Sequence, residues 1–211
     1  IPLKQKGVDT GMGLERLAIV LQNKNSVFET DLFLALIEKI HELSPTTNYK
    51  LQATSYRIIA DHIKAAVFLI SDGVLPLNIE QGYVLRRILR RAIRYGKLLN
   101  LPKNFLIPLA QKVIEIYQNI YSELKLKEKN ILTIIQNEEE KFEKTLEKGL
   151  KNLKLQIADC KLKNLKILPG KIVFNLFQSY GFPMELTEEL AKEENLEINK
   201  EEFENEFKKH Q

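Results

Sequence analysis

A carboxylate, two glycines and a guanidinium lie within eight residues near the start of this sequence, at Asp9, Gly11, Gly13 and Arg16. Glycine lets a ligand approach the backbone closely, and a helix N-terminus attracts anions. A carboxylate pairs with an ammonium group, while a guanidinium binds phosphate or stacks on a flat ring. The stretch therefore suits a molecule with an amine and a phosphate. It equally suits a glycine turn capped by Asp9, with Arg16 in solvent.

A run of positive charge without an acidic residue follows, made up of Arg86, Arg87, Arg90, Arg91, Arg94 and Lys97. On a helix these side chains cover about one and a half faces, where they repel one another unless anions offset them. A polyanion such as RNA is one such partner. The alternative is a set of ion pairs with the Glu-rich segments of the same chain.

Two amide side chains complete the candidates. Asn78 lies in the loop before the arginine run, and Gln178 precedes Tyr180-Gly181-Phe182-Pro183. An amide offers both donors and acceptors to the edge of a base. Asparagine in a loop is more often a turn residue, so neither position carries weight alone.

Composition limits the class of protein. The 211 residues are 44% hydrophobic and 28% charged, which is enough for one core or two small domains. A single cysteine, Cys160, excludes a disulfide framework and favours a cytoplasmic location. No zinc-ligand spacing is present, so we predict no metal site. No apolar run approaches the roughly 20 residues of a membrane span.

Helical periodicity dominates the elements that must position these residues, because Gly and Pro are sparse. Helices are expected over 14–22, 31–43 with Asp31 as N-cap, 55–70, 83–99, 103–121, 128–155, 171–180, and from 185 onward. The helix over 128–155 should carry its charges outside and bury Ile131, Ile134, Ile135, Phe142, Leu146, Leu150 and Leu153. Residues 1–13 suggest a strand and a turn. The prediction is a mostly α chain with a short β remnant at the N-terminus.

Five stretches together resemble one family, the bacterial-like alanyl-tRNA synthetases of class II. They are VDTGMGLERL, IIADHIKAAVFLISDGVLPLN, GYVLRRILRRAIRYG, EEEKFEKTLEKGL and YGFPMELT. They occur in the family's order and cover nearly the whole chain, although the tail from about Glu193 matches loosely.

The resemblance gives the first candidates a role. VDTGMGLER is similar to motif 3 of a class II synthetase, which implies that Asp9 holds the amino group of alanine. Gly11 and Gly13 would let the substrate lie close, and Arg16 would meet ATP. The family activates alanine with ATP and Mg²⁺ and transfers it to the 3′ end of tRNA. ATP and Mg²⁺ are thus implied for the complete enzyme, with no zinc site in this chain.

The resemblance also implies two domains. Residues 1–25 would be the C-terminal piece of the catalytic domain, and residues 26–211 a helical domain that recognises the tRNA acceptor stem. Motifs 1 and 2 would lie upstream of Ile1, and the editing domain and oligomerisation region beyond Gln211. We therefore expect the chain to need the remainder of the catalytic domain as its partner, and to be inactive in alanine activation alone.

The tRNA contacts implied by the family fall on Asn78 and, on the arginine helix, on Arg86, Arg87, Arg90, Arg91 and Arg94. The family reads a G·U wobble pair with an Asn and an Asp, and the Asp position is Gln178 here. This departure puts the usual recognition in doubt. A rival hypothesis is a non-catalytic helical RNA-binding module or separate subunit, and a third is a structural bundle without ligands.

Overall fold

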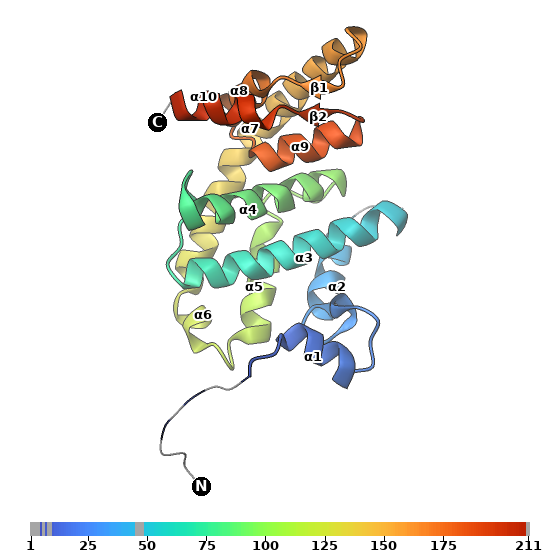
Figure 1. Ribbon diagram of the computed structural model, residues 1–211. Coiled ribbons are helices and arrows are strands. Elements are labelled where there is room, and N and C mark those ends of the chain that lie inside the picture. Colours follow the sequence, from blue (N-terminus) through green and yellow to red (C-terminus); the bar gives the residue numbers. More distant parts are fainter. Residues whose placement is uncertain (1–4, 6, 8–9, 45–48, 210–211) are drawn as a thin grey trace.

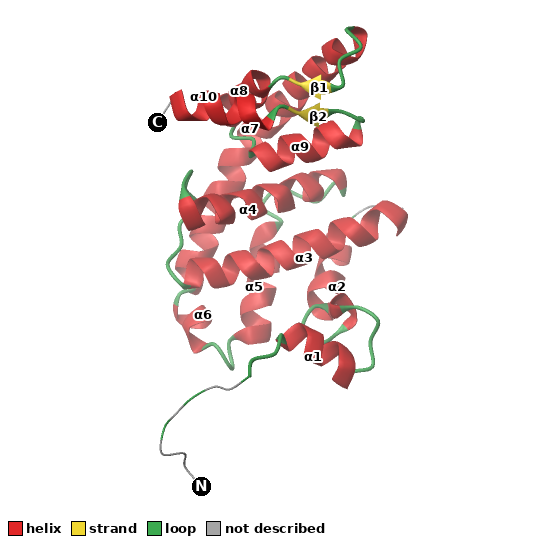
Figure 2. Ribbon diagram, viewed as in Figure 1, coloured by secondary structure: helices red, strands yellow, loops and turns green. Residues whose placement is uncertain are grey.

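Helices make up nearly all of the structure, a computed structural model that describes residues 5, 7, 10–44 and 49–209 (Figure 1, Figure 2). The helices are α1 (Leu14–Leu21), α2 (Leu34–Leu43), α3 (Tyr49–Ser71), α4 (Glu80–Leu98), α5 (Leu106–Tyr117), α6 (Ser122–Leu126), α7 (Glu128–Leu162), α8 (Gly170–Tyr180), α9 (Met184–Glu193) and α10 (Lys200–Lys209). A 3₁₀ turn, η1 (Val27–Glu29), and two short strands, β1 (Ile167–Leu168) and β2 (Glu197–Ile198), complete them. The mostly α prediction is confirmed.

Helix α7 runs along most of the molecule and contacts α3, α4, α5, α6 and α8. Its 35 residues correspond to a length of about 52 Å. Proline is absent from it, Gly149 is its single glycine, and good helix formers fill its exposed positions. Glu128 in the first turn and Lys161 in the last turn match the helix dipole. The helices α3 to α6 before it and α8 after it are therefore packed along one continuous helix.

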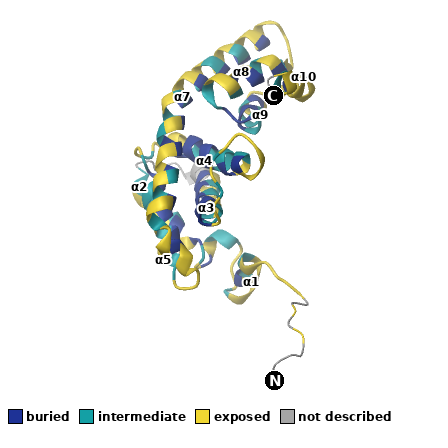
Figure 3. Cartoon of the chain, turned by 90° about the vertical axis from the view of Figure 1, so that its left-hand side faces the viewer, coloured by how far each residue is buried: buried dark blue, intermediate teal, exposed yellow. Residues whose placement is uncertain are grey.

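The core lies mainly where α3 and α4 pack against each other and against α5 and α7. Ile59, Ile63 and Val67 of α3 are fully buried, as are Leu85 and Leu89 of α4. In Figure 3 the buried positions gather on α3 and α4, whereas α1 and the outer side of α7 are largely exposed. These residues follow the helical spacing expected from the sequence.

The segment from residue 185 onward is mostly helical, as expected, but a short strand interrupts it. It consists of α9, β2 and α10, and β2 pairs in parallel with β1 through Ile167↔Glu197 and Leu168↔Ile198. Asn195, at φ +60°, ends α9, a backbone conformation that Asn tolerates. Leu196 and Ile198 are then buried, which favours an extended segment over a further helical turn.

Other helix boundaries differ from those expected from the sequence. Helix α7 continues to Leu162 because Ile157 and Cys160 extend its buried stripe. The helix expected over 103–121 is shorter in the structure, where α5 spans Leu106–Tyr117, and α6 begins separately at Ser122. Asp31 was expected as the N-cap of α2, but the N-cap is Phe33. The Asp31 carboxylate instead accepts a 2.6 Å hydrogen bond from the Gln22 side chain.

The expected N-terminal strand is not found among the described residues. Thr10 to Gly13 lie outside any strand, and the described chain has no strand beside them with which to pair. Asp9 lies outside the described residues. Of the apolar residues that the helical period places on one face of α1, only Ala18 is buried, while Leu14, Leu17 and Leu21 are exposed.

Two glutamates of α7 contradict the expectation that its charges all lie outside. Glu138 and Glu139 are buried. Glu139 accepts a hydrogen bond from the backbone N–H of Leu106 at 3.3 Å, at the start of α5. Its other oxygen, also buried, has no hydrogen-bond partner among the described residues. Burial raises the pKa of Glu139 to about 8, and the nearby Glu143 adds to the shift.

This pKa makes the stability of the fold depend on pH. The unfolded chain loses the Glu139 proton near the ordinary pKa of 4.5, whereas the folded chain keeps it to about pH 8. The stabilisation is complete below pH 4.5 and is lost as the pH rises to 8, at up to about 1.4 kcal/mol per pH unit. Glu139→Gln should flatten this dependence and gain stability over the wild type between pH 5 and pH 8, measured by urea unfolding.

The exposed Glu123 of α6 provides the control, since Glu123→Gln should leave the pH profile unchanged. A parallel loss of stability with pH in Glu139→Gln and the wild type would contradict the assignment.

Candidate nucleic-acid interface

Asn78 and Gln178 are a hundred residues apart in the sequence and line the same pocket. Asn78 comes from the loop before α4, and Gln178 from the last turn of α8. The pocket has a volume of about 240 Å³, and we call it the Asn78–Gln178 pocket. It is lined by Asn78, Tyr83, Arg86, Arg90, Lys141, Thr145, Phe177, Gln178, Ser179, Tyr180, Gly181 and Pro183.

The lining of this pocket is positive. Arg86, Arg90 and Lys141 contribute to it, and no described carboxylate does. Lys141, from the exposed side of α7, has no ion-pair partner among the described residues. A concave surface of this charge attracts anions.

The two amides differ in their freedom. Arg86 Nη1 donates a hydrogen bond to Asn78 Oδ1, so the Asn78 side chain presents its amino end to a partner. Gln178 is exposed, and none of the described residues binds its amide. Asn78 is therefore an oriented donor, whereas Gln178 can offer either its donor or its acceptor end.

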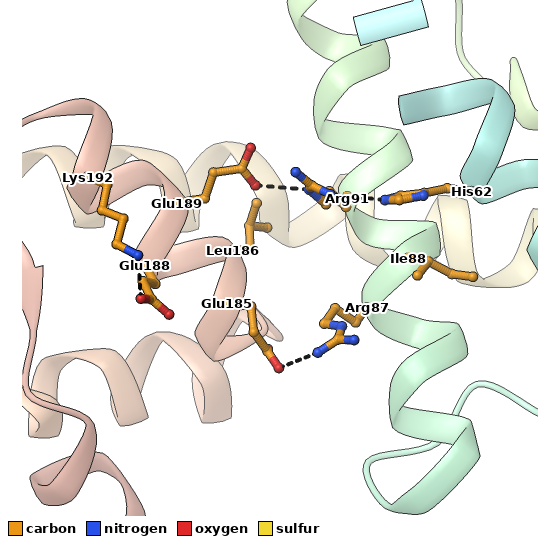
Figure 4. A pocket seen from close by; sticks show the side chains of 9 residues that line it. All are labelled: His62, Arg87, Ile88, Arg91, Glu185, Leu186, Glu188, Glu189 and Lys192. Carbon is orange, nitrogen blue, oxygen red and sulfur yellow. Dashed lines mark hydrogen bonds and ion pairs between the residues drawn. The ribbon is translucent and has the colours of Figure 1, made fainter. Parts of the chain in front are cut away.

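The remaining arginines of α4 face glutamates of α9. Arg87 pairs with Glu185 at 2.6 Å, and Arg91 with Glu189 at 3.1 Å. These residues line a second pocket of about 420 Å³ between the two helices, together with His62, Ile88, Leu186, Glu188 and Lys192. Figure 4 shows both pairs reaching across it, with Arg91 also next to His62.

The Glu185 carboxylate connects α9 to α4. Glu185 accepts hydrogen bonds from the Tyr83 hydroxyl at 2.7 Å and from Arg87 at 2.6 Å. Burial acts to raise the pKa of Glu185, but these hydrogen bonds outweigh it, and the pKa is lowered. Burial also raises the pKa of Tyr83, and the hydrogen bond to Glu185 adds to it. At neutral pH the carboxylate is therefore ionised and the phenol protonated.

Charge is unevenly compensated around α4. Four of its cations pair with four carboxylates, namely Arg87, Arg91, Arg94 and Lys97 with Glu185, Glu189, Glu193 and Glu147. At the Asn78–Gln178 pocket, Arg86 and Arg90 share the single carboxylate of Glu138. The ion-pair alternative for the arginine run is confirmed. Arg86 and Arg90 together leave one positive charge unbalanced by Glu138, in addition to that of Lys141. Contact of the five arginines with RNA stays a prediction.

Of the N-terminal candidates, Gly11, Gly13 and Arg16 lie in and just before α1, at the other end of the molecule from α8 (Figure 1). Gly13 is the N-cap of α1, and Arg16 lies exposed in its first turn with no ion-pair partner among the described residues. A side chain added at Gly11 would meet nothing within 4 Å, and one at Gly13 would meet only Arg16. Neither glycine has a positive φ. Packing within the described chain thus gives no reason for glycine at either position, and the role of the two glycines in substrate binding stays a prediction.

The described residues contain no group of three His, Cys, Asp or Glu side chains placed to hold a metal ion. Among them, too, no helix combines the length and apolar character required to cross a membrane.

The sequence did not predict several residues of the pocket region, and three of them bear on its charge and shape. Lys141 and Thr145 line the pocket, and Glu138 lies behind it. A signal for Glu138 does exist: it stands three residues after Ile135 and four before Phe142, where the helical period requires a buried position. A glutamate in an apolar stripe indicates a buried partner. Lys141 gives no such signal, because lysines recur throughout the exposed face of α7.

Comparison with known proteins defines the class. The family model described as "tRNA synthetases class II (A)" matches residues 1–211, and the chain belongs to this family. It is 45% identical over 208 residues to the alanine–tRNA ligase of Bacillus subtilis (strain 168), covering 98% of this chain and 24% of that protein.

Two further relatives have the same name. The alanine–tRNA ligase of Endomicrobium trichonymphae is 46% identical over 209 residues, 99% of this chain and 24% of that protein. That of Borrelia hermsii (strain HS1 / DAH) is 49% identical over 213 residues, 99% of this chain and 35% of that protein. The resemblance to the alanyl-tRNA synthetases is confirmed. The chain spans about a quarter of the length of the first two relatives.

The burial of the arginines gives a prediction for stability. Arg90 is 6% exposed and its removal leaves the buried Glu138 without its closest partner, so Arg90→Ala should cost about 3–5 kcal/mol. Arg91 is 38% exposed, and Arg91→Ala should cost less than about 1 kcal/mol. The two values are read from urea unfolding of the matched variants. Equal losses would show that burial does not distinguish the two ion pairs.

Proposed function

We propose that this chain is the part of an alanine–tRNA ligase that completes the site for alanine and ATP and binds the acceptor stem of tRNA(Ala). Residues 1–25 belong to the catalytic domain in this proposal, and residues 26–211 to the tRNA-recognition domain. The proposal rests on the family and on the names of the relatives. The observation that carries it is the meeting of Asn78 and Gln178 in one positively lined pocket.

The Asn78–Gln178 pocket suits the minor groove of an RNA helix. This groove is wide and shallow, so side chains reach its base edges and 2′-hydroxyls. Asn78, with its oxygen bound by Arg86, offers an amino group to acceptors such as a pyrimidine O2 or a hydroxyl. Gln178 has a free amide that accepts a hydrogen bond from the 2-amino group of guanine. Lys141, which lines the pocket and has no ion-pair partner among the described residues, favours the adjoining phosphates.

The N-terminal residues serve the first step of the reaction in this proposal. The Asp9 carboxylate holds the ammonium group of alanine, and Gly11 and Gly13 leave the backbone open to the substrate. Arg16 contributes a guanidinium to ATP. Mg²⁺ accompanies ATP in the complete enzyme and neutralises phosphate charge, and no residue of this chain is assigned to it. Alanyl-adenylate forms with loss of pyrophosphate, and alanine then passes to the tRNA 3′ end.

Alanine-dependent ATP–pyrophosphate exchange tests the catalytic part in a complete synthetase that contains this chain. Asp9→Ala should lose about 2–5 kcal/mol of transition-state stabilisation, because the ammonium group loses its charge partner in a desolvated site. The exposed Asp72 gives a control, since Asp72→Ala should leave the exchange rate unchanged. Binding of tRNA by a complete protein that shows no exchange would favour the non-catalytic RNA-binding module instead.

The identity of residue 178 sets how sharply the stem is read. An ionised Asp only accepts hydrogen bonds and makes stronger ones, whereas Gln is neutral and can turn to donate. Discrimination between stems with G·U and G·C should therefore be small in the wild type, at or below about 1–3 kcal/mol. Gln178→Asp should widen it, measured as the ratio of kcat/KM for the two tRNAs.

Gln111 on α5 is also exposed and lies away from the pocket. Gln111→Asp therefore makes the same charge change and should leave the ratio unaltered. A strong preference for G·U that is indifferent to Gln178→Asp would assign the reading to another residue.

A further inference from the structure

One buried carboxylate connects the two amide-bearing walls of the Asn78–Gln178 pocket. The Glu138 side chain is 4% exposed and projects from α7 towards α4. Its Oε1 accepts hydrogen bonds from Arg90 Nε at 2.7 Å and lies 2.6 Å from Arg90 Nη2. Arg86 Nε lies 3.4 Å from the same oxygen. Arg90 also stacks over Phe142, 4.9 Å from its ring centre.

Each of these arginines contacts one wall of the pocket. One wall is the loop of Asn78, and the other is the end of α8 with Gln178 and Gly181. Arg86 donates to Asn78 Oδ1 on one side. Arg90 donates to the carbonyl oxygen of Gly181 on the other, three residues after Gln178. Both walls are therefore connected to the same carboxylate through one guanidinium each. Arg90 makes a hydrogen bond to Glu138, whereas Arg86 is held by the 3.4 Å ion pair alone, since its buried Nε has no hydrogen-bond partner among the described residues.

The Gly181 carbonyl is a specific target for this contact. Gly181 has φ +68°, and the hydrogen bonds Gly181 N–H to Phe177 and Phe182 N–H to Leu176 form a Schellman end to α8. Arg90 meets the C-terminal end of the helix dipole, where a cation is favoured. A side chain at residue 181 would run into the Arg90 guanidinium, so the backbone and the arginine fit each other closely.

We propose that Glu138 is a positioning residue for recognition of the acceptor stem. By holding Arg86 and Arg90 it fixes the separation of Asn78 and Gln178 and the orientation of the Asn78 amide. This inference rests on the proposed function of the pocket. The negative charge is required because Arg86 and Arg90, four residues apart on one helix, repel each other without it. Arg86 then moves away and releases Asn78.

The test uses a complete synthetase that contains this chain, with transcripts of tRNA(Ala) whose acceptor stems carry G·U or G·C. Glu138→Gln keeps the shape of the side chain and removes its charge. The KM for tRNA should rise by roughly tenfold, and the ratio of kcat/KM between the two stems should fall. Alanine-dependent exchange without tRNA should be retained, and Glu138→Asp, which keeps the charge, should recover part of the stem preference.

A matched control comes from the opposite side of α4. Glu189 also receives two arginines, Arg91 at 3.1 Å and Arg94 at 3.4 Å, but it lines the other pocket. Glu189→Gln should leave the stem preference unchanged. Equal effects of the two substitutions would overturn the positioning role, because they would show a general response of α4. An unchanged KM and stem preference in Glu138→Gln would also overturn it.

Arg86→Gln covers the case in which Glu138→Gln does not fold, since the closer pair of Arg90 and Glu138 remains intact. It should reduce the stem preference while the slope of log affinity against log salt stays constant. A slope lower by about 0.7–0.9 would show that Arg86 contacts a phosphate directly. It would overturn the positioning role of Glu138. Absence of both exchange and charging in the wild-type complete protein would instead refute the proposed function itself.

Discussion

Burying a guanidinium requires a carboxylate close by, and α4 buries two, Arg90 and Arg94. Their partners come from α7 through Glu138 and from α9 through Glu189 and Glu193. The C-terminal helices therefore cannot take any position around α4 that leaves these charges unpaired. Apolar packing brings the helices together, while the ion pairs define which faces meet, since hydrophobic contact alone has little direction.

The same arrangement places the fully paired arginines and the incompletely paired arginines on different sides of α4. Where α4 faces α9, glutamates match the cations in number, so this side is internally satisfied. Where it faces the loop of Asn78 and the end of α8, two arginines share one carboxylate. A helix that is uniformly basic in sequence thus becomes basic on one side only in the fold, and that side carries the two amides.

Sequence periodicity was sufficient for the helices and for most of the core, because burial repeats every three to four residues whatever the partner. It could not choose between RNA and glutamate as partners of the arginines, since that choice depends on contacts between residues such as Arg87 and Glu185, about a hundred positions apart. The parallel pair of β1 and β2 was missed for the same reason. Lys141 could be recognised as a candidate only from the fold, which brings it into the same pocket as Asn78 and Gln178.

The freedom of Gln178 has a consequence for how such a protein can change. Its side chain is exposed and is bound by none of the described residues, while the backbone beneath it is fixed by Thr145, which donates to the Tyr180 carbonyl at 2.8 Å, and by Arg90. A substitution at position 178 therefore costs the fold little. The framework and the side chain at position 178 can therefore change independently. Under the proposed function, the preference for a stem can change in a lineage while the helices that carry residue 178 stay intact.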